Sequence, residues 1–233
     1  MKSNKVVFLG MPHRERRIGV CQIHNILSSG QVKKKMLTGS HGIQTMNANM
    51  LYVAALNDPE VDVFCYLHDD IRLPENWMEK MLDIMEKNDA DVLSVVAPIK
   101  DKRGLTSIAL DEFPLNDNIP AVAEHRVRRL TLKEIHENYP PTFTHPKLLI
   151  NNGCVMINMR HPRAKDIYYR FDDRIVHIDG KYIASTISDD WLISRDCQKF
   201  GMKVFATREI YLVHEGNMDY DNTKWGNWDT DLK

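Results

Sequence analysis

A series of short apolar runs separated by segments of helical spacing most constrains how this chain can fold. The strongest run is Val61 to Leu67, which stops where His68, Asp69 and Asp70 begin. Short runs rich in β-branched and aromatic residues predict buried strands. Strands that alternate with helices predict a parallel sheet with helices on both faces. We therefore expect an α/β, Rossmann-like fold built on a central, mostly parallel sheet.

The same patterns predict the other elements. The expected strands are 5–10, 32–37, 61–67, 91–99, 148–159, 203–206 and 210–213. The expected helices are 18–27, 43–56, one that begins near Pro74, and one that runs from a Ser188 cap to Phe200 and Gly201. In the helix over 43–56, the residues that largely share one face, as in a helix packed on a core, are Ile43, Met46, Met50, Val53, Ala54 and Leu56.

Length and composition set further limits. A chain of 233 residues is expected to form one domain over 1–233, with a proline-interrupted excursion over 100–147 on the acceptor side and an irregular tail over 217–233. A net charge of −1 gives no global attraction to nucleic acid or to an anionic membrane. The scattered positions of Cys21, Cys65, Cys154 and Cys197 predict reduced core thiols. No apolar run is long enough for a signal sequence or a spanning helix, so we expect a cytoplasmic protein.

Two acidic segments are candidates for chemistry. Asp69 and Asp70 follow the strongest strand, and Asp189 and Asp190 open a helix. Adjacent carboxylates at a strand end repel one another unless a cation or hydrogen-bond donors share them, and hard oxygen ligands favour Mg²⁺ or Mn²⁺. Helix capping and a favourable charge at a helix N-terminus are the simpler explanations of the same residues. His214 ends a third strand and alone predicts nothing specific.

The order of these segments resembles a known family. His-Asp-Asp at 68–70, Asn-Asn-Gly-Cys at 151–154, Asp-Asp-Trp at 189–191 and Val-His-Glu at 213–215 follow one another as in the GT-A glycosyltransferases. The resemblance covers about residues 5–216. It is to the inverting family that includes cellulose, chitin and hyaluronan synthases, and it implies a GT-A fold.

The resemblance also implies roles for individual residues. Asp70 would bind the Mn²⁺ or Mg²⁺ that bridges the donor diphosphate, and His214 would complete the metal site. Asp190 would be the general base, with Asp189 as its orienting or acceptor-binding neighbour. The remaining donor contacts would come from His68, which replaces the family's usual first acid, and from Asp69, Asn152 and Gly153.

The implied activity is metal-dependent transfer of a sugar from a nucleotide-sugar donor, UDP- or GDP-linked, to an acceptor hydroxyl with inversion. The acceptor stays open between a glycan, a lipid-linked sugar, a protein and modified DNA. Two alternatives remain: a catalytically inactive nucleotide-sugar-binding or scaffold module, and a metal-dependent nucleotidyltransferase, for which Gly10 to His13 is a poor version of the usual loop. Residues with further open roles in phosphate, acceptor or sugar contacts are Arg14, Arg16, Arg17, Arg126, Arg128, Arg129, Trp191, Trp225 and Trp228.

Overall fold

The computed structural model describes residues 4–13, 19–112, 127–178 and 180–223. Arg14, Arg16, Arg17, Arg126, Trp225 and Trp228 lie outside these residues, so the expectations placed on them stay predictions.

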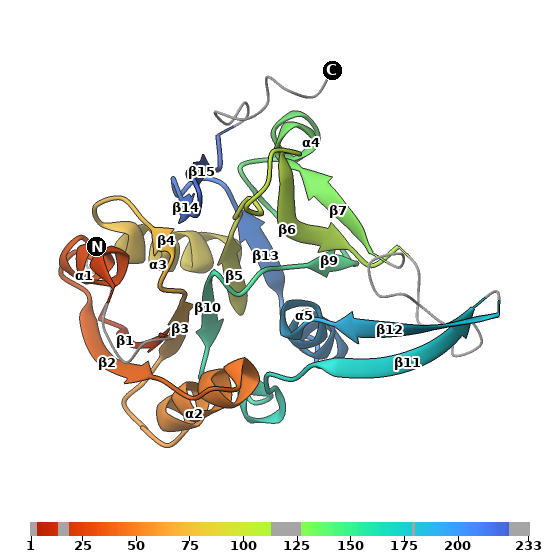
Figure 1. Cartoon of the computed structure of the whole chain (residues 1–233). Helices are drawn as coiled ribbons and strands as arrows, with labels where there is room; N and C mark the ends of the chain where they lie inside the picture. Colours follow the sequence, from red (N-terminus) through yellow and green to blue (C-terminus); the bar gives the residue numbers. More distant parts are fainter. Residues whose placement is uncertain (1–3, 14–18, 113–126, 179, 224–233) are drawn as a thin grey trace.

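A seven-stranded sheet forms the centre of the molecule (Figure 1). Its strand order is β2 (Lys33–Gly39), β1 (Val6–Pro12), β3 (Val63–Leu67), β10 (Cys154–Asn158), β5 (Val92–Val95), β13 (Val204–Thr207) and β8 (Thr142–Phe143). β1 is parallel to β2 and β3, and β5 is parallel to β13. β10 runs antiparallel to both β3 and β5, and β8 runs antiparallel to β13. All strands except β10 and β8 thus share one direction, which confirms the Rossmann-like, mostly parallel prediction.

Helices cover both faces of this sheet, as predicted. They are α1 (Val20–Leu27), α2 (Gln44–Leu56), α3 (Trp77–Asn88), α4 (Leu132–Asn138), α5 (Asp189–Lys199) and the short 3-10 helix η2 (Ala164–Asp166). The alternation of β3 side chains explains the two layers. Phe64 and Tyr66 belong to the core under α2 and α5, whereas Cys65 and Leu67 belong to the core under α3. All four cysteines of the chain are buried and free.

Three smaller sheets surround the central one (Figure 1). β4 (Ile71–Arg72), β14 (Val213–Glu215) and β15 (Asp219–Asp221) form one, and β6 (Leu105–Leu110), β7 (Arg128–Thr131) and β9 (Leu148–Leu149) form another. β11 (Asp172–Ile178) and β12 (Lys181–Ile187) form a hairpin. The described part of 100–147 therefore contains regular structure, and the expected strand over 148–159 is divided in two at Asn151 to Gly153.

The predicted buried face of α2 was wrong. The exposed side of the helix carries Met46, Met50 and Val53, with Ile43 at its N-cap, and the buried side carries Asn47, Ala48, Leu51, Tyr52 and Ala55. The helix lies close to the sheet because glycines face it: a Cβ on Gly10 would lie 3.2 Å from Leu51 Cβ. The side-chain nitrogen of Asn47 donates to the Gly39 carbonyl at 2.9 Å, whereas its Oδ1 is buried and has no hydrogen-bond partner within the described residues. No helix within the described residues is long and apolar enough to cross a membrane.

Candidate functional site

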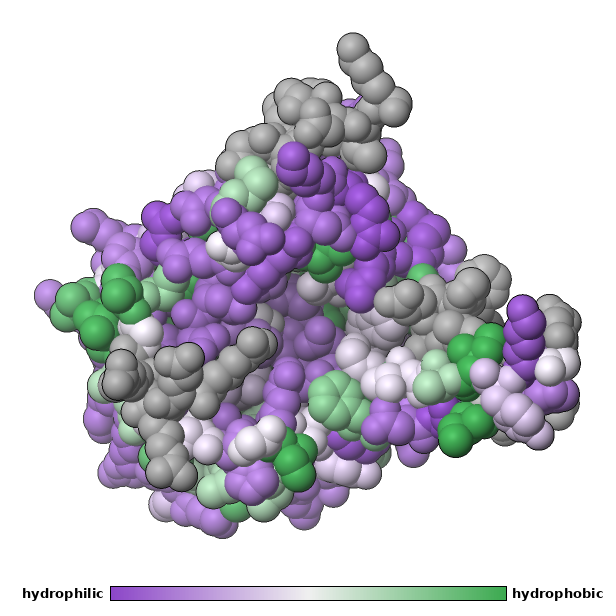
Figure 2. Space-filling view, in the orientation of Figure 1, coloured by the Kyte–Doolittle hydropathy of each residue, from purple (hydrophilic) through white to green (hydrophobic). Residues whose placement is uncertain are grey.

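A pocket of about 300 Å³ lies at the carboxyl ends of β1, β2 and β3. Its lining residues are Pro12, His13, His41, Gly42, Gln44, Asn47, Tyr66, His68, Asp69 and Asp70. β2 and β3 lie on opposite sides of β1, so the chain reverses its direction of winding here. Such a switch point is where open α/β sheets bind ligands. The face shown in Figure 2 is hollowed near its centre, where hydrophilic residues gather.

The structure brings Asp70 and His214 together at one side of this pocket. β4 pairs antiparallel with β14, which places His214 opposite Ile71. His214 Nδ1 lies 2.7 Å from the Pro98 carbonyl and donates to it, so Nε2 faces Asp70 Oδ1 at 3.6 Å. Sequence-distant residues meet here because two short strands pair.

His214 and Lys100 flank the Asp70 carboxylate. Burial disfavours the Asp70 carboxylate, yet His214 and Lys100 together hold its pKa well below the usual range. Lys100 Nζ lies 2.5 Å from Oδ2, whereas Oδ1 is buried and has no hydrogen bond within the described residues. The carboxylate oxygen of Asp70 suits Mn²⁺ or Mg²⁺, whereas the imidazole nitrogen of His214 is a softer ligand than these cations usually take. No group of three or more His, Cys, Asp or Glu side chains gathers in the described part of the chain, so a cation would need further ligands from a bound diphosphate or water.

His68 and Asp69 line the pocket itself. The His68 amide donates to the Gly153 carbonyl at 2.9 Å, and the His68 ring meets the Tyr66 ring edge-on at 5.3 Å. Burial lowers the pKa of His68, which favours a neutral imidazole. Gly153 thus lies beside the end of β3, next to His68, and its role as a donor contact stays a prediction.

Asp189 and Asp190 open α5 beside Asn152. Ser188 occupies the predicted N-cap position but makes no capping hydrogen bond through its side chain. Asp190 Oδ1 accepts a hydrogen bond from the backbone N–H of Asn152 at 2.9 Å. Burial and the neighbouring charge of Asp189 raise the pKa of Asp190, and burial also raises that of Asp189. A raised carboxylate pKa is expected of a general base.

Several buried polar atoms around this pair have no hydrogen-bond partner within the described residues. They are Asp189 Oδ2, both polar side-chain atoms of Asn152, and the Tyr66 hydroxyl. Leaving such atoms unpaired costs about 1–3 kcal/mol each, and native structures seldom do so without a reason. A polar ligand with several hydroxyl groups would satisfy them.

Sequence patterns alone missed two residues near these acids. Tyr66 was assigned to the core as part of an apolar run, but its pKa is raised by burial and then by the charges of Asp189, Asp190 and Asp69. It therefore lies within electrostatic reach of both acidic segments. Lys100 belongs to the segment where periodicity faded. The sequence signal for Tyr66 was a tyrosine one residue before the end of a strand that leads into acids.

The basic residues around β7 have different roles. Arg128 bonds Glu112 at 3.1 Å and also pairs with Glu134, so it holds β7 and α4. Arg129 lies over the Trp191 ring at 4.9 Å and lowers the pKa of Asp190 in opposition to burial. Trp191 is 4% exposed, which supports its role as the anchor of α5 rather than as a stacking surface.

No protein-family model matches the chain, and no curated protein matches it. Among solved structures it is similar to A197 from STIV, with a TM-score of 0.53 and 11% identity over 94% of this chain and 90% of that one. It is also similar to 4-diphosphocytidyl-2C-methyl-D-erythritol synthase from Anaerococcus prevotii DSM 20548, with a TM-score of 0.39 and 9% identity over 89% and 91% of the two chains. The likeness is one of fold. At a TM-score below 0.5 the synthase supports no argument about function.

Proposed function

We propose that this protein transfers a glycosyl group from a nucleotide-sugar donor to an acceptor hydroxyl with the help of Mn²⁺ or Mg²⁺. The observation that carries the proposal is the placement of two acidic groups around Tyr66 at the end of β3. Asp70 with His214 forms one group at the switch-point pocket, which Tyr66 also lines, and Asp189 with Asp190 forms the other, whose charges act on Tyr66. Glycosyl transfer needs both kinds of group, a cation site for the departing diphosphate and a base for the acceptor.

The pocket suits the nucleotide of the donor. It is lined by Asp69 and His68 on one side and by the start of α2 on the other. Asp70 Oδ1 and His214 Nε2 would hold the cation, which when bound neutralises charge on the departing diphosphate. Lys100 adds a positive charge at the same point and would compete with the cation for Asp70.

Asp190 would act on the acceptor. Its carboxylate would take the proton of the acceptor hydroxyl as the acceptor oxygen bonds to the anomeric carbon and the bond from that carbon to the diphosphate breaks. The hydrogen bond from the backbone N–H of Asn152 fixes the position of Asp190 Oδ1 for this step. Asn152, Gly153 and Asp189 lie next to the sugar in this arrangement, where the unpaired Asn152 and Asp189 atoms would meet its hydroxyl groups.

A melting experiment with a panel of UDP-, GDP-, CDP- and dTDP-sugars tests the donor site, with Mn²⁺ or with EDTA. A ligand at about 100 times its Kd stabilises the fold by about 2.7 kcal/mol, which raises the melting temperature clearly. We expect one nucleotide class to do so in Mn²⁺ and to lose most of the effect in EDTA. In Asp70→Ala the Mn²⁺-dependent part should disappear. Equal shifts with and without the metal would remove the metal site from the proposal.

Transfer itself requires a second readout. Mass spectrometry of candidate acceptors incubated with the donor found in the panel should detect one added sugar and release of the nucleoside diphosphate. Binding without transfer to any glycan, lipid-linked, protein or DNA acceptor would favour the inactive binding module. Release of pyrophosphate from a nucleoside triphosphate would instead favour a nucleotidyltransferase.

A further inference from the structure

Tyr169 is a buried tyrosine that the proposed mechanism does not use. It lies between η2 and β11 and is 1% exposed. The side chain of Asn49 in α2 holds its backbone at two points: Nδ2 donates to the Tyr169 carbonyl at 2.7 Å, and Oδ1 accepts from the Tyr169 N–H at 2.8 Å. The next residue, Arg170, pairs with Asp196 of α5. Tyr169 is therefore fixed against both α2 and α5.

Three tyrosine rings pack together here, but their hydroxyl groups differ in their surroundings. The Tyr169 ring centroid lies 5.3 Å from that of Tyr66 and 6.1 Å from that of Tyr52. The Tyr52 hydroxyl donates to the Ala164 carbonyl at 2.7 Å. The hydroxyls of Tyr66 and Tyr169 are buried and have no hydrogen-bond partner within the described residues. Because an unpaired buried hydroxyl destabilises a fold, this difference indicates a ligand.

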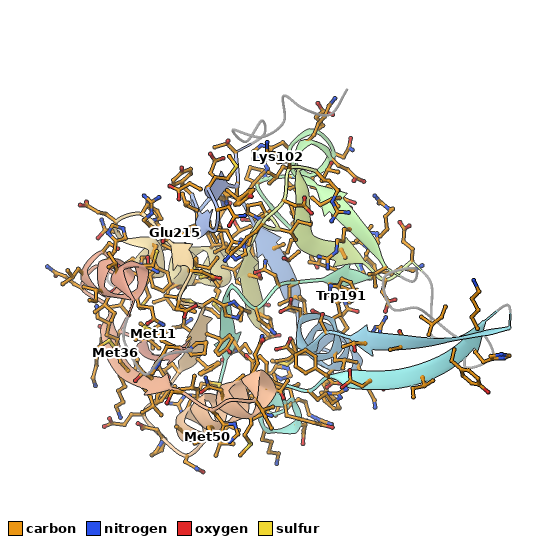
Figure 3. All side chains as sticks on the ribbon, in the orientation of Figure 1. Met11, Met36, Met50, Lys102, Trp191 and Glu215 are labelled. Atoms are coloured by element: carbon orange, nitrogen blue, oxygen red, sulfur yellow. The ribbon has the colours of Figure 1, made fainter. Side chains whose placement is uncertain are left out.

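The two unpaired hydroxyls lie near the acid that opens α5. Burial raises the pKa of both, and the charge of Asp189 raises it further, so both tyrosines lie within electrostatic reach of that carboxyl group. Asp189 Oδ2 and both polar side-chain atoms of Asn152 are also buried and unpaired in the described part of the chain. Tyr66 lines the switch-point pocket as well, which connects these atoms to it. Trp191, labelled in Figure 3, lies two residues after Asp189 and marks this end of α5.

The mixture of donors and acceptors indicates what kind of ligand fits. A tyrosine hydroxyl donates or accepts, a carboxylate oxygen accepts, and an asparagine side chain does both. A phosphate group would meet the carboxyl groups of Asp189 and Asp190, so like-charge repulsion disfavours it. A neutral group that both donates and accepts, such as a sugar hydroxyl, can pair with every one of these side chains.

We propose that Tyr169 is a specificity-determining residue, whose hydroxyl, together with that of Tyr66, binds one hydroxyl of the transferred sugar. This inference rests on the proposed function, which supplies the sugar nucleotide. The protein would then select a sugar by that hydroxyl, because a sugar that lacks it leaves two buried tyrosine hydroxyls unpaired.

Tyr169→Phe tests this role, because it removes the hydroxyl and keeps the ring. Isothermal titration calorimetry in Mn²⁺ compares the sugar nucleotide found in the melting panel with its free nucleoside diphosphate. We expect the variant to bind the sugar nucleotide about three- to tenfold more weakly than the wild type does, the effect of one lost hydrogen bond. The free diphosphate should bind both proteins equally.

Deoxy analogues of the same sugar nucleotide locate the contact. The analogue that lacks the bound hydroxyl should have the same Kd for the wild type and for Tyr169→Phe, since neither protein can form the hydrogen bond. Every other analogue should keep the three- to tenfold difference. Such a pattern separates a direct contact from a general change in the shape of the site.

Tyr52→Phe is the matched control, because the hydroxyl it removes has a partner in the fold. It should lower the melting temperature of the unliganded protein and leave the ratio of the two Kd values, for sugar nucleotide and free diphosphate, unchanged. Tyr169→Phe should change that ratio without lowering the melting temperature, since its hydroxyl makes no hydrogen bond to the described residues.

The outcomes distinguish this inference from the proposed function. If Tyr169→Phe binds the sugar nucleotide as tightly as the wild type does, or weakens both ligands by the same factor, Tyr169 does not select the sugar, while the donor site stands. A lower melting temperature with an unchanged Kd ratio would assign the Tyr169 hydroxyl to an internal hydrogen bond, through water, and would likewise overturn its role. A wild type that binds no sugar nucleotide overturns the proposed function and this inference with it.

Discussion

At the scale of single residues, the neighbouring acids at the start of α5 combine two opposed properties. Asp189 is buried, and burial together with the charge of Asp189 raises the pKa of Asp190. A base with such a pKa gains proton affinity, which favours proton transfer from a hydroxyl group. The same repulsion destabilises the folded protein, since the charged form is disfavoured there. In the proposed mechanism, Asp190 therefore favours activity and disfavours stability.

Replacing Asp190 by Asn should separate these effects. We expect transfer to be lost, because an asparagine at position 190 cannot take the proton. Metal-dependent nucleotide binding should remain, because the side-chain oxygen of the new residue can still accept a hydrogen bond from the backbone N–H of Asn152. The variant should also be more stable at neutral pH, by about 1 kcal/mol, because a charge is removed beside the buried Asp189 carboxylate. Activity assays, nucleotide titration and thermal melting together check this prediction.

The way the stability gain of Asp190→Asn changes with pH tests whether the pKa of Asp190 is raised in the folded protein. A group with a raised folded pKa destabilises the fold only above its unfolded pKa, about 4 for aspartate, and the destabilisation grows until the folded pKa is passed. The stability difference between Asp190→Asn and the wild type should thus be smallest near pH 4 and largest at alkaline pH. Wild-type activity should fall on acidification at a pH above that unfolded value, since the protonated form is no base. A variant that binds nucleotide more weakly with no change in the chemical step would contradict the base assignment.

At the scale of elements, the packing of α2 depends on close approach to β1. A Cβ on Gly10 would lie 2.9 Å from Phe64 Cε2 and 3.2 Å from Leu51 Cβ. These neighbours belong to the core between α2 and the sheet, so they have little room to move. The interior side of α2 carries Ala48, Leu51, Tyr52 and Ala55, whereas its methionines are exposed.

Gly10→Ala should therefore destabilise the protein by about 1–3 kcal/mol, the usual effect of overpacking a core. Urea unfolding followed by fluorescence measures this loss as a lower midpoint with an unchanged slope. Gly42→Ala is the matched control, because a Cβ there meets nothing within 4 Å although the residue lines the pocket. If the two variants had equal midpoints, close packing at Gly10 would not be the reason for the orientation of α2.

At the scale of the whole molecule, stability is unevenly distributed. β3 and β10 lie inside the central sheet with a strand on each side, whereas β11 and β12 pair only with each other in the described part of the chain. The hairpin extends away from the body (Figure 1), and Ile175 and Tyr182 on it are 79% and 80% exposed. Two-stranded hairpins of this kind are marginally stable in water.

Hydrogen exchange should reveal this difference. The amides of β11 and β12 should exchange through local opening, well before those of β3 and β10, which require opening of the central sheet. Mass spectrometry of peptides from each strand compares the rates in a single sample. Equal protection in the hairpin and the sheet would mean that the hairpin is covered in solution.

Sequence patterns were enough to predict the α/β class, the order of most strands and helices, and the positions of the acids at a strand end and a helix start. The spacing of apolar residues carries this information, because burial of one face of a helix or strand makes apolar residues recur at the period of that element. The resemblance further predicted that Asp70 and His214 would share a site, and the structure places them 3.6 Å apart, although their role with a metal stays a proposal.

Contacts between distant segments settled the rest. They include the pairing of β4 with β14, the ion pair of Lys100 with Asp70, and the position of Tyr66 near both acidic groups. The buried face of α2 was mispredicted because apolar side chains occur on both sides of the helix: the side that meets the sheet carries Ala48, Leu51, Tyr52 and Ala55, and the other side carries Met46, Met50 and Val53. The spacing of apolar residues indicates how apolar a face of the helix is. The shape of the surface that it meets is set by residues elsewhere in the chain, so tertiary packing selects the face that is buried.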